Sequence, residues 1–474
     1  MPHTAPVPQS PPAANEQDSV TRFTFDRLAA FLLFLAIFGA ACLMPAQSDT
    51  FWQLRAGAET VASGHVQLRD TFTHTVRGTY WPNHEWGAEV AFYLLHRLGG
   101  FPLLTFVLSL VVGGAWWLTW RLMRGSTRLR VVIVAVLAVS SARLWSLRPQ
   151  VLSLVLLAAA VTLLVKQREL WRMPLFTVWA NLHGGVVLGF AAVAGALLGA
   201  AVIEPARWRR FVVVVLGCAA ATCASPLGLS LWTEVPDMLQ RLQQYQVAEW
   251  QRTSLVDPWN LPYWTVCVVV PLLTWRRRHS LQRQDALVIG ASLTLLLLGG
   301  RTTRNVMPAL MITAAALSRL LAKGATPSPA IRRERPLFNA AVAGAATVGV
   351  VAWVAAGWGH GADRFQWEPM SGEAIRAVAQ CRPPLYNLYD HGGFITWLAP
   401  AQPVFVDSRQ DPFPPQLILD QITAESTGDY RDLFARYQIG CAVLPPGSKV
   451  AQRLTTDGWR VAYRDARWVV LEAS

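Results

Sequence analysis

The sequence predicts a mainly α-helical, polytopic membrane domain followed by a small extracytoplasmic α/β domain. Of the 474 residues, 53% are hydrophobic and only 15% are charged, whereas a soluble domain is close to a quarter charged. The charges fall in short clusters between long uncharged runs, which is typical of a chain that lies largely in lipid. The net charge of +13 comes with Arg clusters at the ends of apolar runs, which membrane topology explains better than nucleic-acid binding. The 21 Trp residues fit a protein with a large lipid–water interface.

The uncharged runs predict about 9–11 transmembrane or broken helices. Several runs are shorter than the roughly 20 residues that a helix needs to cross about 30 Å of hydrocarbon, so we expect tilted or broken helices around a wet cavity. Residues 1–22, ahead of the first run, are rich in Pro and Ala and predict a disordered cytoplasmic tail. The runs cover residues 28–45, 100–120, 131–142, 151–165, 173–203, 211–224, 261–275, 286–300, 305–318 and 337–359.

The run 173–203 decides the predicted topology, because it can be one span or a broken hairpin. Asn181, His183 and the pair Gly184-Gly185 interrupt its first third. The positive-inside rule favours the hairpin, which leaves few basic residues in the short outer loops. Those few are Arg143, Arg148, Arg241, Arg252, Arg301 and Arg304. The short inner loops then hold Arg121, Arg124, Arg128, Arg130, Lys166, Arg168, Arg172, Arg207, Arg209, Arg210, Arg276, Arg277, Arg278, Arg283, Arg319, Lys323, Arg332, Arg333 and Arg335.

This topology places the first outer loop, residues 46–100, on the same side as residues 224–260 and the C-terminal segment. A membrane domain over residues 23–360 therefore carries an extracytoplasmic domain over residues 361–474. Helical stretches alternate in that domain with strand-like runs at 384–388, 404–406, 441–444, 459–463 and 468–471. Cys381 and Cys441 lie in it, so they can form a disulfide in an oxidising compartment. The sequence gives no distance between them, and we favour two unpaired structural cysteines over the disulfide.

Motifs in the first outer loop resemble those of one family. "DTFWQLRAG" (49–57), "RDTFTHT" (69–75) and "WPNHEWGAE" (81–89) resemble the first periplasmic loop of bacterial membrane proteins in the GT-C glycosyltransferase superfamily. These proteins are similar to polyprenyl-phosphate-sugar-dependent mannosyl-, arabinosyl- and galacturonosyltransferases. The resemblance extends over most of the chain, through "LWRMPLFTVWANLHGG" (170–185), "AEWQRTS" (248–254), "GGRTTRNVMP" (299–308), "YNLYDHGGFITWL" (386–398) and "VFVDSRQDPFP" (404–414).

The resemblance implies an inverting enzyme with an Asp general base in a bacterial cell envelope. It would move a sugar from a polyprenyl-phosphate donor to a glycan, lipid or protein acceptor at the outer face of the inner membrane. Its C-terminal domain would be periplasmic, and its partners would include membrane lipids but no nucleic acid. The sequence predicts no cofactor, and a divalent metal, Mg²⁺ or Mn²⁺, is the open alternative. The lack of a paired acidic residue beside Asp49, which many members have, argues against a metal-dependent mechanism.

Two other functions are alternatives to simple sugar transfer. One is a polymerase or ligase of lipid-linked oligosaccharide, for which residues 224–260 would supply a long outer loop. The other is a non-enzymatic transporter or flippase for a glycolipid. Transporters often have repeated halves and charges at the membrane midplane, and the sequence shows neither.

Asp49 is the predicted catalytic base. It follows the first predicted helix, so its carboxylate lies near the headgroup plane and within reach of a lipid-linked phosphate. Sugar transfer to a hydroxyl needs a base for the acceptor proton, and a partly desolvated carboxylate suits that role. From its position alone, Asp49 can equally cap the helix that follows it.

His84 and Glu85 are predicted to act as a second acid/base pair or as a polar clamp on the sugar. The alternative for Glu85 is a helix start, where its charge favours the helix dipole. Trp52 and Trp86 are predicted to stack on the apolar face of the sugar. Asp70 is predicted to bind substrate, or to cap a turn.

Arg301 and Arg304 lie on the outer side, against the positive-inside bias, so we expect each to have a partner. A guanidinium matches phosphate oxygens and would neutralise the leaving polyprenyl phosphate. The alternative is interaction with lipid headgroups. Arg148 is likewise predicted either to bind the phosphate or to interact with lipid headgroups. His183, at the break of the hairpin, is predicted to point into the cavity, although a lone His can also be a satisfied buried residue.

Overall fold

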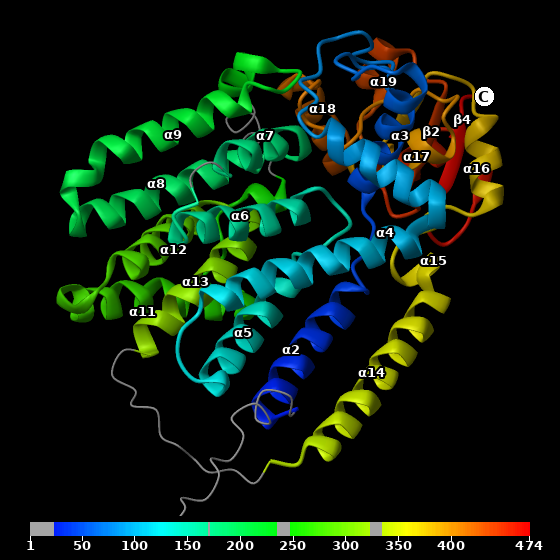
Figure 1. The fold of residues 1–474 in the computed structure, drawn as a ribbon. Helices are drawn as coiled ribbons and strands as arrows, with labels where there is room; N and C mark the ends of the chain where they lie inside the picture. Colours follow the sequence, from blue (N-terminus) through cyan, green and yellow to red (C-terminus); the bar gives the residue numbers. More distant parts are fainter. Residues whose placement is uncertain (1–22, 169–170, 235–246, 323–333) are drawn as a thin grey trace, which may run out of the picture.

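The computed structural model describes residues 23–168, 171–234, 247–322 and 334–474, and it consists of a bundle of long helices with a mixed α/β layer at one end (Figure 1). The predicted tail, residues 1–22, lies outside the described residues. The bundle contains α2 (Phe25–Ala41), α4 (Trp86–Leu122), α5 (Thr127–Ala142), α6 (Gln150–Val165), α7 (Arg172–Leu182), α8 (Val186–Ile203), α9 (Trp208–Thr222), α11 (Leu261–Arg277), α12 (Arg283–Arg301), α13 (Val306–Ala322) and α14 (Pro336–Gly359).

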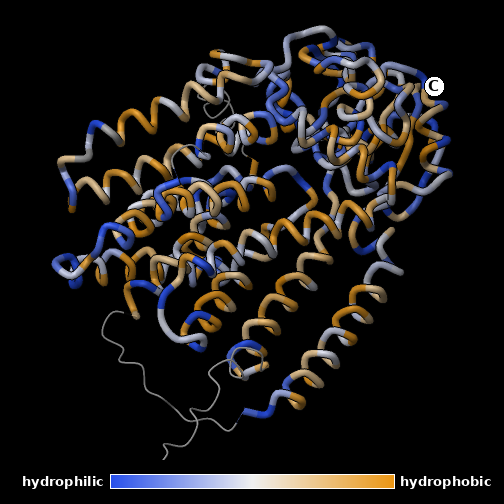
Figure 2. Tube along the Cα trace, in the orientation of Figure 1, coloured by the Kyte–Doolittle hydropathy of each residue, from blue (hydrophilic) through white to orange (hydrophobic). Residues whose placement is uncertain are grey.

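Hydrophobic residues run along these helices, whereas the α/β layer is more hydrophilic (Figure 2). Four helical segments within the described residues are long and apolar enough to cross a membrane, namely Trp86–Leu122, Val186–Ile203, Thr303–Ala322 and Pro336–Gly359. The segments Gln150–Val165 and Phe211–Thr222 are apolar but shorter. The prediction of a multi-pass helical membrane protein is confirmed.

Helix α4 changes direction between its outer and inner parts. Gly99 and Gly100 have non-helical backbone angles there, and Gly100 has a φ of 62°, a conformation that residues with a Cβ rarely adopt. The first part of α4 packs against α3 (Ser48–Ser63), the helix of the first outer loop. Because of this bend, the first part of α4 packs in the α/β layer and the second part packs in the helix bundle.

The run 173–203 forms two helices, as the hairpin prediction requires. Helix α7 ends at Leu182, His183 has an extended backbone, and α8 begins at Val186. Helices α7 and α9 run in the same direction, because a Cβ on Gly217 would lie 2.5 Å from the Met173 side chain and Asn181 Nδ2 donates to Ala224 O at 2.9 Å. Helix α8 leads from the end of α7 to the start of α9, so it runs back through the bundle.

The C-terminal segment forms a four-stranded sheet in the order β1-β2-β4-β3. Strand β1 (Leu385–Asn387) pairs in parallel with β2 (Cys441–Leu444), and β4 (Val469–Glu472) pairs antiparallel with both β2 and β3 (Arg460–Arg464). The helices of this segment are α15 (Gly361–Arg364), α16 (Gly372–Ala379), α17 (Gly392–Leu398), α18 (Pro415–Thr427), α19 (Arg431–Tyr437) and α20 (Lys449–Thr456).

The predicted strand 404–406 is not part of this sheet. It pairs with the first outer loop instead: Val404 N donates to Phe72 O at 3.0 Å, and His74 N donates to Val404 O at 3.1 Å. Thr75 Oγ1 also donates to Phe405 O at 2.6 Å. The first outer loop and the C-terminal segment therefore form one continuous layer on the same side of the bundle, as Figure 1 shows.

The expectation of two unpaired cysteines in this segment is wrong. Cys381 and Cys441 form a disulfide, with their Cα atoms 5.8 Å apart. The pair joins the end of α16 to strand β2, two places that lie 60 residues apart in the chain. Sequence spacing alone gave no information about this distance.

We predict that a reporter fused after Ser474 lies outside the cytoplasm, because α14 leads away from the basic segment that precedes it. Alkaline phosphatase at this position should be active, and a fluorescent protein that matures only in the cytoplasm should stay dark. The same reporters fused after Arg335, just before α14, form the matched control and should give the opposite result. Cytoplasmic fluorescence from the fusion at Ser474 would contradict the topology.

Candidate active site

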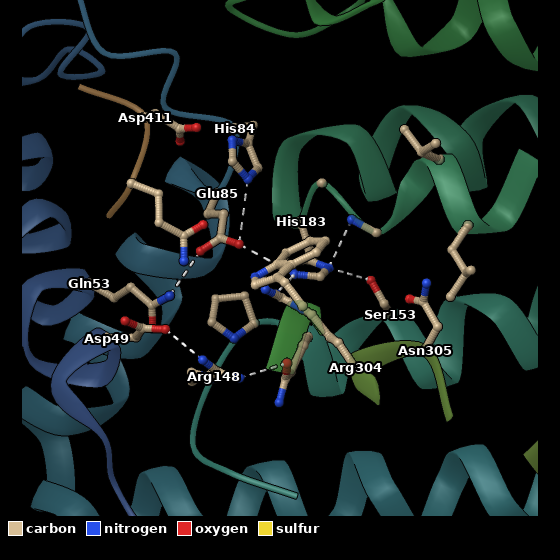
Figure 3. A pocket seen from close by; sticks show the side chains of 18 of the residues that line it. Asp49, Gln53, His84, Glu85, Arg148, Ser153, His183, Arg304, Asn305 and Asp411 are labelled. Carbon is tan, nitrogen blue, oxygen red and sulfur yellow. Dashed lines mark hydrogen bonds and ion pairs between the residues drawn. The ribbon is translucent and has the colours of Figure 1, made fainter. Parts of the chain in front are cut away.

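A cavity of about 280 Å³ lies where the outer layer meets the helix bundle (Figure 3). Its walls come from α3, from the starts of α6 and α8, from the junction of α12 and α13, and from the chain that follows Val406. Most of the predicted site residues line it, although they are spread over much of the sequence. These residues are Asp49, Trp52, His84, Glu85, Arg148, His183 and Arg304.

A chain of ion pairs, in which carboxylates alternate with guanidinium groups, runs across the cavity. Arg148 Nη1 lies 2.7 Å from Asp49 Oδ2, and Arg148 Nη2 lies 2.6 Å from Glu249 Oε2. The other oxygen of Glu249 lies 3.2 Å from Arg304 Nη1. Two guanidinium groups thus share the carboxylate of Glu249, and one of them also holds Asp49.

Glu249 is ionised because of these two arginines. Burial alone would raise its pKa, but the charges of Arg304 and Arg148 and the hydrogen bond from Arg148 outweigh burial and hold the pKa at about 2. Glu249 therefore carries a full negative charge at neutral pH. It lies between the guanidinium groups of Arg148 and Arg304 and contacts both.

His183 extends the network on the bundle side. Its Nε2 lies 3.1 Å from Arg304 Nη2 and 3.4 Å from Glu85 Oε1. Its Nδ1 accepts from Gly185 N at 3.0 Å and lies 2.7 Å from Ser153 Oγ. The break between α7 and α8 therefore turns this ring into the cavity, as predicted, and fixes it there.

Glu85 is the carboxylate most shielded from water in this network. Gln53 Nε2 donates to Glu85 Oε2 at 2.8 Å, and His84 Nε2 lies 3.7 Å from Glu85 Oε1. Burial raises the pKa of Glu85, and this effect exceeds the opposing attraction of His84 and Arg304. Glu85 therefore holds a proton more readily than an exposed glutamate.

Asp49 does not cap α3. Gln47 is the N-cap residue, where its backbone N–H donates to Thr50 Oγ1 at 3.0 Å. The Asp49 carboxylate instead faces the cavity, where it accepts hydrogen bonds from Trp52 Nε1 at 3.3 Å and from the Ser408 hydroxyl, in addition to the Arg148 contact. The capping role is therefore excluded, and the Asp49 carboxylate is one of the charged groups of the cavity.

Three predicted site residues are not among those that line the cavity. Asp70 is fully buried in an ion pair with Arg409 and also accepts from the backbone N–H of Thr73 at 3.2 Å, so it builds the loop. Trp86 Nε1 donates to Asn181 Oδ1 at 2.9 Å and joins α4 to α7. Arg301 is exposed at the end of α12.

Glu249 and Gln53 take part in the site although the sequence did not single them out. A signal existed for Glu249, because arginines on the outer side require partners and Glu249 is an acid within an outer motif. Gln53 carried no such signal, because neutral polar residues are common in loops. Ser408 lies in the segment 407–411 that follows the predicted strand 404–406, and such a position at the end of a strand predicts either an acceptor-binding loop or a loop held by salt bridges. Among the described residues, no group of three or more His, Cys, Asp or Glu side chains is placed to hold a metal ion.

No protein-family model matches the chain, and no curated protein matches it in sequence. Solved structures do match. ArnT from Cupriavidus metallidurans bound to undecaprenyl phosphate has a TM-score of 0.55 and 14% identity, over 94% of this chain and 97% of that one. The apo form of the same protein has a TM-score of 0.53 and 13% identity, over 92% and 96% of the two chains.

A second match is the archaeal oligosaccharyltransferase AglB from Archaeoglobus fulgidus, in complex with an inhibitory peptide and a dolichol-phosphate. Its TM-score is 0.56 with 11% identity, over 88% of this chain and 69% of that one. At such low identities the likeness establishes the fold alone. ArnT and AglB are both GT-C glycosyltransferases. The chain therefore has the GT-C fold, as the motifs of its first outer loop predicted.

Proposed function

We propose that the protein is a membrane glycosyltransferase that moves a sugar from a polyprenyl-phosphate donor to an acceptor at the outer face of the inner membrane, with Asp49 as the general base. The observation that carries this proposal is the joint presence of Asp49, Arg148 and Arg304 in one cavity on the side of the α/β layer. ArnT and AglB, which share the fold, were solved with undecaprenyl phosphate and dolichol-phosphate.

The two ends of the cavity suit the two ends of a lipid-linked sugar. The bundle side is apolar, with α8 and α13 contributing Val187, Leu188, Ala191, Met307 and Pro308. An isoprenoid chain would lie there next to the membrane. The polar side contains the arginines, whose guanidinium groups match phosphate oxygens in geometry and charge.

A donor phosphate can bind Arg148 and Arg304 only if it replaces one of their present carboxylate partners. Arg148 and Arg304 are balanced by Asp49 and Glu249 in the structure described here. A donor phosphate brings another negative charge, so it competes with Glu249 for the same guanidinium groups. We expect Glu249 to move aside when the donor binds.

In the reaction, the acceptor hydroxyl oxygen would attack the anomeric carbon while Asp49 takes its proton. The bond from that carbon to the phosphate oxygen breaks, and polyprenyl phosphate leaves with the electron pair, held by Arg148 and Arg304. A single in-line displacement of this kind inverts the anomeric carbon. Hydrogen bonds from Trp52 and Ser408 orient the Asp49 carboxylate for this step.

The disulfide supports a periplasmic position for residues 361–474. Disulfides persist in oxidising compartments and are rare in the cytosol, and Cys381 and Cys441 both belong to the layer that carries the cavity. Acceptor and donor would then meet on the outer side of a bacterial inner membrane. The alternatives are block transfer of an oligosaccharide, as by a polymerase or ligase, and glycolipid transport, and the Asp49→Asn experiment separates transport from transfer.

We predict that Asp49→Asn lowers sugar transfer by roughly 10²- to 10⁴-fold, because Asn keeps the shape but cannot take a proton. Turnover with a lipid-linked sugar and donor binding are measured separately. Glu59→Gln, a carboxylate change on the same helix but away from the cavity, is the matched control and should leave turnover near wild type. Full transfer by a folded Asp49→Asn variant would remove Asp49 from the mechanism, and transport without transfer would support the flippase alternative.

We also predict that Arg304→Lys weakens polyprenyl phosphate binding roughly tenfold, because Lys keeps the charge but loses the two-pronged donor geometry. The dissociation constant in detergent micelles is the readout. Arg301→Lys, three residues away and outside the cavity, should bind like wild type. Equal affinities for the two variants would show that Arg304 does not contact the phosphate.

A further inference from the structure

The segment 251–260, which leads from Glu249 to α11, exposes three large apolar side chains. Leu255 is 77% exposed, Val256 is 90% exposed and Trp259 is 59% exposed. The first two are adjacent in the chain, and the third follows closely. Single exposed apolar side chains are normal on a protein surface, whereas several that lie together mark a contact surface. We therefore expect a partner to cover this segment.

Hydrogen bonds hold the start of the segment against the end of α12. Thr303 N donates to Gln251 O at 3.0 Å, and Thr253 Oγ1 donates to Gly299 O at 2.5 Å. Gly299 lies in the last turn of α12, and Thr303 directly precedes Arg304, which lines the cavity. The segment is therefore fixed to the junction of α12 and α13 that carries this arginine.

Polar contacts hold the end of the segment as well. Asp257 Oδ1 accepts from Trp259 N at 3.0 Å, and Asp257 Oδ2 lies 2.6 Å from Arg143 Nη1. The other terminal nitrogen of Arg143 donates to Asn260 Oδ1, and Asn260 is buried. Polar side chains of this segment thus contact the protein while its large apolar side chains face away from it. A loop that faces water has the reverse pattern.

The segment lies at the ends of bundle helices, on the side of the α/β layer. Arg143 directly follows α5, and α11 begins at Leu261, directly after the segment. Helix α11 packs against α13, which belongs to the candidate span Thr303–Ala322. Along α11, Leu261, Val268 and Leu272 are exposed. The apolar surface that the bundle presents to lipid therefore continues from α11 onto the segment.

The residue types of the segment suit a lipid surface. Tryptophan is enriched at the boundary between membrane and water, where Trp259 would lie. Arg252 is exposed just ahead of Leu255 and Val256, and an arginine at that depth extends its charge to the headgroups. Together with the continuity from α11, this composition favours lipid over a protein partner.

We propose that residues 251–260 form a membrane-surface anchor, in which Leu255, Val256 and Trp259 insert into the lipid leaflet on the side of the α/β layer. This inference goes beyond the proposed function, because it assigns a lipid contact that does not depend on what the cavity binds. The anchor directly follows Glu249 and Trp250 in the chain, so it sets that side of the cavity at the depth of the lipid headgroups.

The test measures the depth of position 256 in a bilayer without any donor. Val256→p-acetylphenylalanine in the full-length protein carries a nitroxide on its ketone, so the native cysteines stay in place. The same change at Val461, an exposed valine on β3 of the α/β layer, is the matched control. Both proteins are placed in nanodiscs of phosphatidylethanolamine and phosphatidylglycerol. Relative to the label at 461, the label at 256 should lose relaxation by a water-soluble nickel chelate and gain relaxation by O₂, which concentrates in hydrocarbon.

Equal relaxation by nickel at the two positions would overturn the anchor. Shielding of position 256 from both nickel and O₂ would overturn it too, because it would show a protein contact, such as one with a second copy of the chain. Neither result bears on sugar transfer, which the Asp49→Asn experiment measures, so failure of the anchor and failure of the proposed function are distinguishable.

Discussion

The site depends on the position of Arg148. This residue lies just before α6, and its guanidinium contacts Asp49 on α3 and Glu249 on the loop that precedes α11. Three segments far apart in the chain therefore meet at one charge. A buried charge that loses its partner is strongly destabilising, so each segment requires the other two. In the proposed function, a donor phosphate would replace one of these carboxylates.

A second buried cation fixes the opposite wall. Arg409 pairs with Asp407 next to it in the sequence and with Asp70 in the first outer loop, at the place where Val404 pairs with that loop. The C-terminal segment is thus part of the cavity rather than an appended domain.

The sequence predicted the fold well because membrane insertion depends on simple quantities, namely run length and the sides on which charges lie. It placed the break at His183 correctly because Gly184 and Gly185 interrupt an apolar run. It left Asp70 as either a substrate-binding or a turn-capping residue, and the structure agrees with the turn, because Thr73 N donates to Asp70. The ion pair of Asp70 with Arg409 was not foreseen, because these two residues are far apart in the sequence. It did not favour the disulfide, because the distance between Cys381 and Cys441 depends on the fold. It did not single out Glu249 either, although the arginines of the same loops signalled that an acidic partner was needed.

The central claim is that donor phosphate replaces Glu249 between Arg148 and Arg304. The most direct measurement is a structure of the full-length protein with polyprenyl phosphate bound. We predict that phosphate oxygens lie within hydrogen-bond distance of both guanidinium groups, and that Glu249 has left at least one of them. A phosphate bound elsewhere, with Glu249 still bridging both arginines, would contradict the account.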